Sequence, residues 1–255
     1  MSASQDLTQK TMEAFSRLPE TDTPTFSSRL NPEYQRKHIA LSLTPGNVLL
    51  ALHRAREARE VAVSHRNFRV GAAITALSVG GPAMFKILTG INYKPGESRD
   101  VNVHAEQLAL LKATDRHLTA ASIVAVVGET QLDQQSGHTM HTLHPCGLCR
   151  DVMKNHPLVD PDATLIVSAL PTFRTIEMST INELDAFHND EQSQAEPITR
   201  FEFPPLKLFE PFVPEPGQTS VEITDTEEDR QEERLWDSSV GVYLMKRRLE
   251  LLDQR

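Results

Sequence analysis

Two short segments, well separated in the chain, carry side chains that must meet at one point if they bind a single metal ion. The segments read Val103-His104-Ala105-Glu106-Gln107 and His144-Pro145-Cys146-Gly147-Leu148-Cys149-Arg150. A catalytic zinc ion takes three protein ligands and keeps a fourth position for water. The imidazole of His104 and the thiolates of Cys146 and Cys149 provide such a set, and two thiolates cancel the charge of the ion. The pattern therefore predicts a Zn²⁺ site.

Glu106 is predicted to move protons at this site and not to bind the ion. It follows His104 by two positions at the start of an expected helix, so its carboxyl can face the pocket and take a proton from water. The order H-x-E, then P-C-x-x-C, is typical of zinc enzymes that deaminate nucleobases, in which this glutamate is the general acid and base.

A C-x-x-C pair by itself has other interpretations, namely a structural zinc knuckle or a redox dithiol. Cys146 and Cys149 are the only cysteines of the chain, so a four-cysteine site is impossible and no further pair can form a disulfide. A redox dithiol needs no His-x-Glu segment. These observations favour the catalytic zinc site over both alternatives.

Length and charge limit the class of protein. The chain has 255 residues, enough for one large domain or a smaller one with extensions, and a net charge of −9. That charge argues against general nucleic-acid binding, which depends on neutralising phosphates. The first residues lack a secretory pattern, no apolar run has membrane-spanning length, and thiols kept as ligands suit a reducing compartment. We expect a cytoplasmic protein with no membrane partner.

Apolar periodicity predicts strands that alternate with helices. Thr44-Pro45 is a predicted helix start, Asn102 is the predicted N-cap of the helix that begins near His104, and Thr180 to Glu183 is a predicted capping box. The expected strands cover residues 68–77, 84–89, 122–128, 163–168 and 173–178, and the expected helices cover 45–63, 146–155 and 181–187. Both ligand-bearing segments thus begin helices that follow strands, where α/β folds place their sites.

Composition divides the chain into three parts: an N-terminal extension of residues 1–43, a catalytic domain of residues 44–190 and a C-terminal extension of residues 191–255. In the last part, four phenylalanines indicate a segment that packs on something. A terminal helix is expected to dock on the domain or on another subunit. Its apolar residues with helical spacing are Val242, Met245, Leu249 and Leu252.

Residues 45–190 resemble the cytidine deaminase family. The segments that carry the resemblance are Phe68-Arg69-Val70-Gly71-Ala72-Ala73, Gly90-Ile91-Asn92, His104-Ala105-Glu106-Gln107, Cys149-Arg150 and the stretch from Phe173 to Phe187. The resemblance implies an α/β fold with a three-layer α-β-α mixed sheet, to which the N- and C-terminal extensions are added. It also implies hydrolysis of cytidine or deoxycytidine to the uracil nucleoside with release of ammonia. One motif set per chain implies a homo-oligomer, a tetramer in preference to a dimer.

The resemblance also implies roles for single residues. Phe68 would flank the pyrimidine, Asn92 would hydrogen-bond the sugar, and Ala105 with Glu106 would read the base edge. Arg150 would hydrogen-bond the thiolates and tune the metal. Two of these residues have structural alternatives, because Phe68 can be part of the core and Asn92 can stabilise its own turn.

Lys94 departs from the family pattern, which has a glutamate that holds a ribose hydroxyl at this position. A cation there weakens capture of a ribose diol and suits an anionic group. The same chemistry on a modified or anionic cytosine compound, such as a blasticidin S-like nucleoside or a nucleotide, is therefore an alternative, as is a Lys94 side chain that points to solvent. A third hypothesis is an inactive zinc-binding assembly protein.

Overall fold

A computed structural model describes residues 32–64, 66–78, 84–97, 102–130, 140–189, 198–210 and 227–253. Most of the predicted N-terminal extension lies outside the described residues, as does Phe212, one of the four phenylalanines. None of the helices in these ranges is both long enough and apolar enough to cross a membrane.

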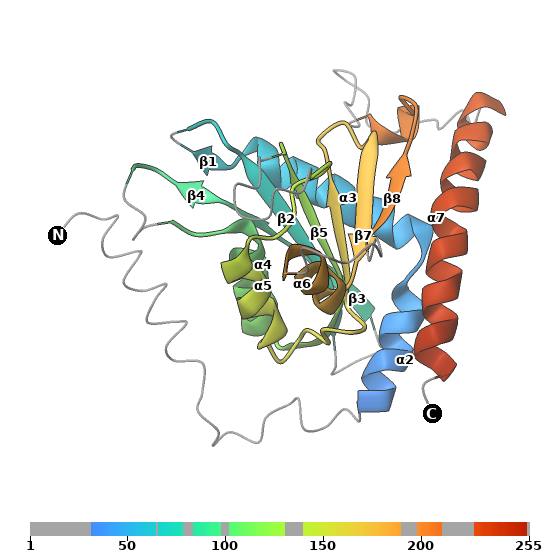
Figure 1. Cartoon of the computed structure of the whole chain (residues 1–255), viewed down its shortest axis with the longest axis horizontal. Coiled ribbons are helices and arrows are strands. Elements are labelled where there is room, and N and C mark those ends of the chain that lie inside the picture. The colour runs from blue at the N-terminus through green and yellow to red at the C-terminus, as the bar shows by residue number, and fades with distance from the viewer. Residues whose placement is uncertain are drawn as a thin grey trace, which may run out of the picture.

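A six-stranded mixed sheet forms the centre of the molecule (Figure 1). Its strands, in spatial order, are β3 (Met84–Ile91), β2 (Val70–Ser78), β5 (Leu118–Gly128), β6 (Leu165–Ala169), β7 (Thr175–Ser179) and β8 (Thr199–Glu202). Only β5 and β6 pair in parallel, and the other neighbours are antiparallel. A separate parallel pair joins β1 (Val63–Ser64) to β4 (Tyr93–Lys94).

Helices cover both faces of the sheet (Figure 1). One face packs against α2 (Pro32–Ser42), α3 (Pro45–Glu60) and α7 (Glu227–Asp253), and the other against α4 (Ala105–Asp115), α5 (Gly147–Lys154) and α6 (Ile181–Asn189). Neighbouring residues of a strand point to opposite faces, so Val126 of β5 joins the core under α4 and Val127 the core under α3. The predicted three-layer α-β-α fold is confirmed.

Predicted capping signals start two of the helices. Thr44 caps α3 by accepting a hydrogen bond from the Asn47 amide at 3.2 Å. Thr180 and Glu183 form the predicted capping box of α6, with hydrogen bonds of 2.7 and 3.3 Å. The predicted N-cap Asn102 is wrong, because His104 occupies that position in α4. The chain is still extended at Val103, which exchanges two backbone hydrogen bonds with Tyr93, so the helix cannot begin at Asn102.

Gly90 lets α4 lie directly against the edge strand β3. A Cβ atom at Gly90 would stand 2.0 Å from the carbonyl oxygen of Ala105, the first residue of α4. A Cβ atom at Gly71 of β2 would likewise stand 2.0 Å from the carbonyl oxygen of Ala55 in α3. The small residues of these strands therefore set how closely each helix layer approaches the sheet.

The C-terminal part of the chain packs on the α3 side of the sheet. Phe203, Phe209 and Trp236 are buried there, with ring centroids 5.5 to 5.8 Å apart. Helix α7 docks through Trp236, Val240 and Leu244. The terminal helix therefore docks on the domain, one of the two predicted alternatives, but not through the predicted stripe of Val242, Met245, Leu249 and Leu252, which is exposed. The predicted division of the chain into an N-terminal extension, a catalytic domain and a C-terminal extension, with boundaries after residues 43 and 190, stays a prediction.

Candidate active site

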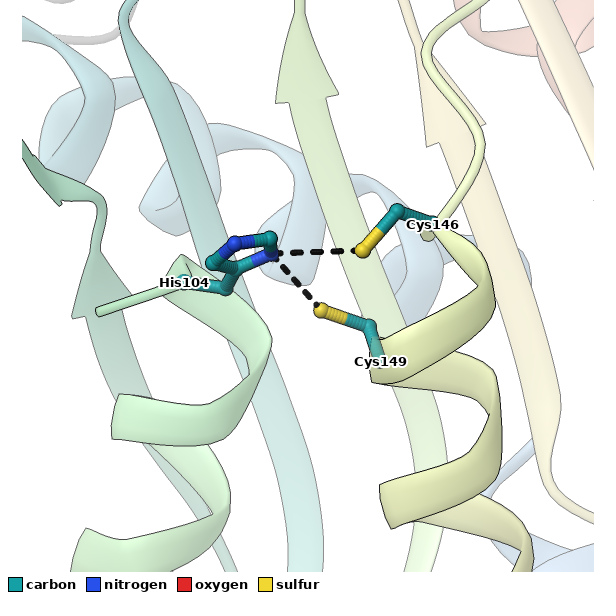
Figure 2. Close-up of side chains that lie close together, drawn as sticks. All are labelled: His104, Cys146 and Cys149. Carbon is teal, nitrogen blue, oxygen red and sulfur yellow. Dashed lines mark hydrogen bonds between the residues drawn. The ribbon is translucent and has the colours of Figure 1, made fainter. Parts of the chain in front are cut away.

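The starts of α4 and α5 bring the three predicted zinc ligands together (Figure 2). His104 is the N-cap of α4, and Cys146 and Cys149 lie at the N-cap and in the first turn of α5. The Nδ1 atom of His104 lies 3.2 Å from the sulfur of Cys149 and 3.3 Å from that of Cys146. All three ligand atoms lie within 4.8 Å of one another.

This donor set fits Zn²⁺. Tetrahedral zinc with ordinary bond lengths holds a nitrogen and a sulfur ligand about 3.6 Å apart, close to the separations seen between His104 and the two cysteines. One imidazole and two sulfurs are also the ligand types that zinc prefers in proteins. Cys146 is exposed and Cys149 is buried, so the site has one side open to solvent.

The two thiols are held in different protonation states. A hydrogen bond from Cys149, together with the neighbouring His104, outweighs the effect of burial and lowers the pKa of the Cys146 thiol to about 3. The same hydrogen bond raises the pKa of Cys149, and burial and the carboxyl of Glu106 add to the effect. The Cys146 thiolate in turn raises the pKa of His104. The cluster thus holds a thiolate ready to bind a cation.

Glu106 lies beside the cluster, in the first turn of α4. Its side chain is buried, with 5% of the residue exposed, and its carboxyl lies within hydrogen-bonding reach of the Cys149 sulfur. Burial raises the pKa of this carboxyl above the ordinary value for glutamate. A buried carboxyl that can hold or release a proton next to a metal site is suited to general acid and base work.

Phe68 and Lys94 lie next to each other near the cluster. The Lys94 ammonium stands 5.7 Å from the centre of the Phe68 ring, and the charge of Lys94 acts on His104. Both side chains are half-buried, and Phe68 also packs against the core under α4. Ala105 is fully buried at the start of α4. These residues therefore gather at one place, and their binding roles stay predictions.

The side chain of Asn92 forms hydrogen bonds with the backbone of an adjacent segment. Its side-chain oxygen accepts a hydrogen bond from the Val70 amide at 2.8 Å, and its side-chain nitrogen donates one to the Phe68 carbonyl at 2.7 Å. Only 1% of the residue is exposed. These contacts are structural, but they join Asn92 to residues 68–70 and not to its own turn, as the alternative from the sequence had it. A bond to a sugar would have to use the second N–H or the second lone pair of the side chain.

Arg150 connects α5 to α6. Its Nε donates to Asp185 at 2.9 Å, and its Nη1 donates at 2.9 Å to the carbonyl of Pro145, the residue before Cys146. The predicted hydrogen bonds to the thiolates would have to use the second N–H of Nη1 or the N–H groups of Nη2, and they stay a prediction. The observed bonds hold the backbone that leads into the first cysteine.

A second buried cluster, centred on Glu177 of β7, supports the same loop and was missed by sequence analysis. The Glu177 carboxylate accepts hydrogen bonds from Thr142 at 2.6 Å, His144 at 3.0 Å and Arg200 at 2.9 Å. Burial alone would raise the pKa of Glu177, but the bonds from His144 and Thr142 outweigh it and lower the pKa to about 2. The available signal was a lone glutamate between Ile176 and Met178 in an apolar strand.

The match to known proteins covers the part of the chain that builds the site. Residues 48–159 match the family model of the cytidine and deoxycytidylate deaminase zinc-binding region. No curated protein matched the chain.

Similar solved structures include cytidine deaminases from three bacteria. The structure from Burkholderia pseudomallei is 27% identical, with 53% of this chain and 93% of that chain covered and a TM-score of 0.41. The Mycobacterium leprae structure is 22% identical over 51% of this chain and 89% of that chain, at a TM-score of 0.35. The Mycobacterium tuberculosis structure is 24% identical, with 46% of this chain and 80% of that chain covered and a TM-score of 0.34.

The matched region contains the cluster of His104, Cys146 and Cys149. The resemblance seen in the sequence is confirmed over residues 48–159, which are similar to the zinc-binding region of the cytidine and deoxycytidylate deaminases.

Proposed function

We propose that this protein is a zinc-dependent hydrolase that converts a cytosine nucleoside, cytidine or deoxycytidine, to the corresponding uracil nucleoside and ammonia. The observation that carries the proposal is the buried Glu106 carboxyl in contact with a His-Cys-Cys cluster inside the matched deaminase region. A cytoplasmic location and a homotetrameric assembly stay predictions from the sequence.

His104, Cys146 and Cys149 would hold the ion, and Glu106 would manage the protons. Bound zinc would supply a Lewis acid for the water that attacks C4 of the pyrimidine. Glu106 would take one proton from the attacking water and deliver it to ring N3. It would then take the second proton from the oxygen bonded to C4 and deliver it to the amino group, so that the C4–N bond breaks, the C4 carbonyl forms and ammonia leaves.

Glu106→Gln tests this role. The amide keeps the shape of the side chain but cannot accept a proton, so ammonia release from cytidine should fall by at least about 100-fold. Zinc content and the thermal midpoint should stay close to those of the parent protein, because Glu106 is not a ligand. Glu129→Gln, an exposed surface change, is the matched control. Undiminished turnover by Glu106→Gln on every active substrate would contradict the assignment.

An anionic or modified cytosine compound is a second candidate substrate, favoured by the position of Lys94 beside Phe68. A cation at this place suits a phosphate or carboxylate better than a ribose diol. Lys94→Glu should raise kcat/KM for cytidine several-fold and lower it for cytidine monophosphate by about tenfold or more. Ammonia release from both compounds, measured with the same zinc-loaded preparation, distinguishes them. Equal effects on both substrates would remove Lys94 from substrate recognition.

A further inference from the structure

Helix α7 has two apolar stripes on opposite sides, and only one of them is covered by the described part of the protein. Trp236, Val240 and Leu244 are buried against the α3 side of the sheet. The second stripe consists of Leu235, Ser238, Val242, Met245, Leu249 and Leu252. We call these six residues the outer stripe. With 3.6 residues per turn, it lies roughly opposite the buried one.

The apolar side chains of the outer stripe are among the most exposed large apolar side chains described. Val242 is 69% exposed, Met245 61%, Leu249 54%, Leu252 42% and Leu235 39%. Figure 1 shows α7 at the outer edge of the molecule beside α2, with no other described element beyond it. A contiguous exposed apolar stripe of this kind marks an interaction surface.

The spacing of the outer stripe determines the kind of partner. Its members follow one another at alternating intervals of three and four residues from Leu235 to Leu252. This is the a/d pattern of a coiled coil, which matches a partner helix with the same repeat. Helix α7 of a second copy of the chain has that repeat by definition. The body of each copy lies on the far side of its α7, so two copies can meet without collision of their domains.

The charges beside the stripe favour a parallel arrangement. Arg248 stands just before Leu249, and Asp253 just after Leu252. In the heptad repeat abcdefg, with the stripe residues at a and d, Arg248 is a g position and Asp253 an e position. In a parallel pair, a g residue of one helix faces the e residue five positions later in the other helix, so each Arg248 faces an Asp253 of the other copy. An antiparallel pair would place g against g. The described g positions of the stripe are Arg234, Gly241 and Arg248, and none of them offers a carboxylate.

We propose that the outer stripe of α7 is a self-association surface, through which two copies of this protein form a parallel two-stranded coiled coil. The surface lies on the side of the sheet opposite to α4 and α5, which carry the metal cluster, and the proposal does not depend on the proposed function. It gives the chain a dimer contact outside the matched deaminase region.

Sedimentation velocity on the full chain tests the proposal first. The parent protein should dimerise at micromolar concentration. Leu249→Glu should raise the dimer dissociation constant by about 100-fold or more, because a buried leucine is lost from both copies. Leu50→Glu is the matched control, since Leu50 is 45% exposed on α3, and it should leave dimerisation unchanged. A monomeric parent protein, or a dimer that is insensitive to Leu249→Glu or equally sensitive to both changes, would overturn the proposal.

Cysteine cross-linking and a charge exchange test the orientation. In a parallel seam Val242 faces itself, so Val242→Cys should give a disulfide-linked dimer on mild oxidation of the zinc-loaded protein, and Glu250→Cys, away from the seam, should not. Arg248→Glu should raise the dissociation constant several-fold, and Arg248→Glu combined with Asp253→Arg should restore it. Absence of the Val242→Cys link in a dimer, or no recovery in the double variant, would overturn the parallel arrangement.

Discussion

At the scale of single residues, the carboxylate of Glu177 ties the loop that leads to Cys146 to strand β7. It is 3% exposed and accepts hydrogen bonds from Thr142 and His144, which lie just before Pro145 and Cys146. A buried carboxylate is stable only when hydrogen bonds replace its hydration. The loop that supplies these bonds is therefore tied to β7 where it approaches the cluster.

Glu177→Gln should weaken zinc binding although Glu177 touches none of the ligands. The amide loses the charge that Arg200 and His144 bond to. Groups bonded directly to metal ligands usually change metal affinity by about 10- to 100-fold, and Glu177 acts one contact further out, so we expect a loss of about tenfold. Zinc affinity can be measured by competition with a chromophoric chelator. Glu202→Gln is the control, because Glu202 accepts a hydrogen bond from Thr175 on the same pair of strands and none from the described residues of the loop. An equal loss of zinc affinity in both variants would mean that the effect comes from general destabilisation of the sheet edge and not from the bonds of Glu177.

Asn92 illustrates why residue roles are harder to predict than ligands. The sequence offered two interpretations of this side chain, and both of its polar atoms bind backbone groups of residues 68–70. Those partners lie more than twenty positions away along the chain. A ligand set, in contrast, is recognised from its chemical types and spacing alone.

At the scale of elements, the helix starts were predictable because their signals are local. Thr44 and the Thr180–Glu183 pair use side chains within three residues of the helix start. The start of α4 was predicted two residues early, since the backbone pairing of Val103 with Tyr93 is a contact between distant segments. Such pairing overrides a good capping residue like Asn102.

Gly90→Ala should disturb the contact between β3 and α4. The new Cβ would stand 2.0 Å from the Ala105 carbonyl oxygen, so the strand or the helix must shift, at a cost of about 1–3 kcal/mol. A shift of α4 also moves His104, the preceding residue. We expect the thermal midpoint to fall by about 3–10 °C and zinc to bind more weakly.

Gly46→Ala is the matched control for that change, because nothing lies within 4 Å of a Cβ atom placed at Gly46. Differential scanning calorimetry with and without zinc separates the loss of stability from the loss of metal. An unchanged thermal midpoint and unchanged zinc affinity for Gly90→Ala would show that β3 and α4 accommodate the methyl group without loss of stability, which would contradict the prediction.

At the scale of the whole molecule, buried titratable groups make stability depend on pH. Burial lowers the pKa of His156 to about 4. Its Nδ1 accepts a hydrogen bond from the Leu158 amide at 3.2 Å, so Nε2 carries the proton and donates to the Thr114 hydroxyl at 3.1 Å. Protonation of Nδ1 would therefore break the bond from Leu158.

Stability should fall as the pH decreases from about 6.5 to about 4, because over this range the unfolded chain binds a proton at His156 and the folded protein does not. The loss from this group is about 3 kcal/mol at full protonation of the unfolded state. A second loss follows between about pH 4.5 and about pH 2, since the pKa of Glu177 is lowered on folding and its stabilisation disappears as the carboxylate is protonated.

Urea unfolding at pH 7 and pH 4.5 measures the first loss. His156→Gln should be less stable than the parent protein at pH 7 but should lose less stability on acidification. A variant whose stability has the same pH dependence as the parent protein would exclude His156 as the source.

The sequence by itself was enough to predict the cluster of His104, Cys146 and Cys149, the neighbouring Glu106, the helix starts at Thr44 and Thr180, and the α/β class. These features follow from residue chemistry and from contacts over a few positions. Only the tertiary structure decided which apolar stripe of α7 is buried, which groups surround Glu177 and what Asn92 bonds to. The reason is that burial and pairing depend on segments brought together by the sheet. An apolar stripe or a lone carboxylate has the same local sequence whether it faces a core or the solvent.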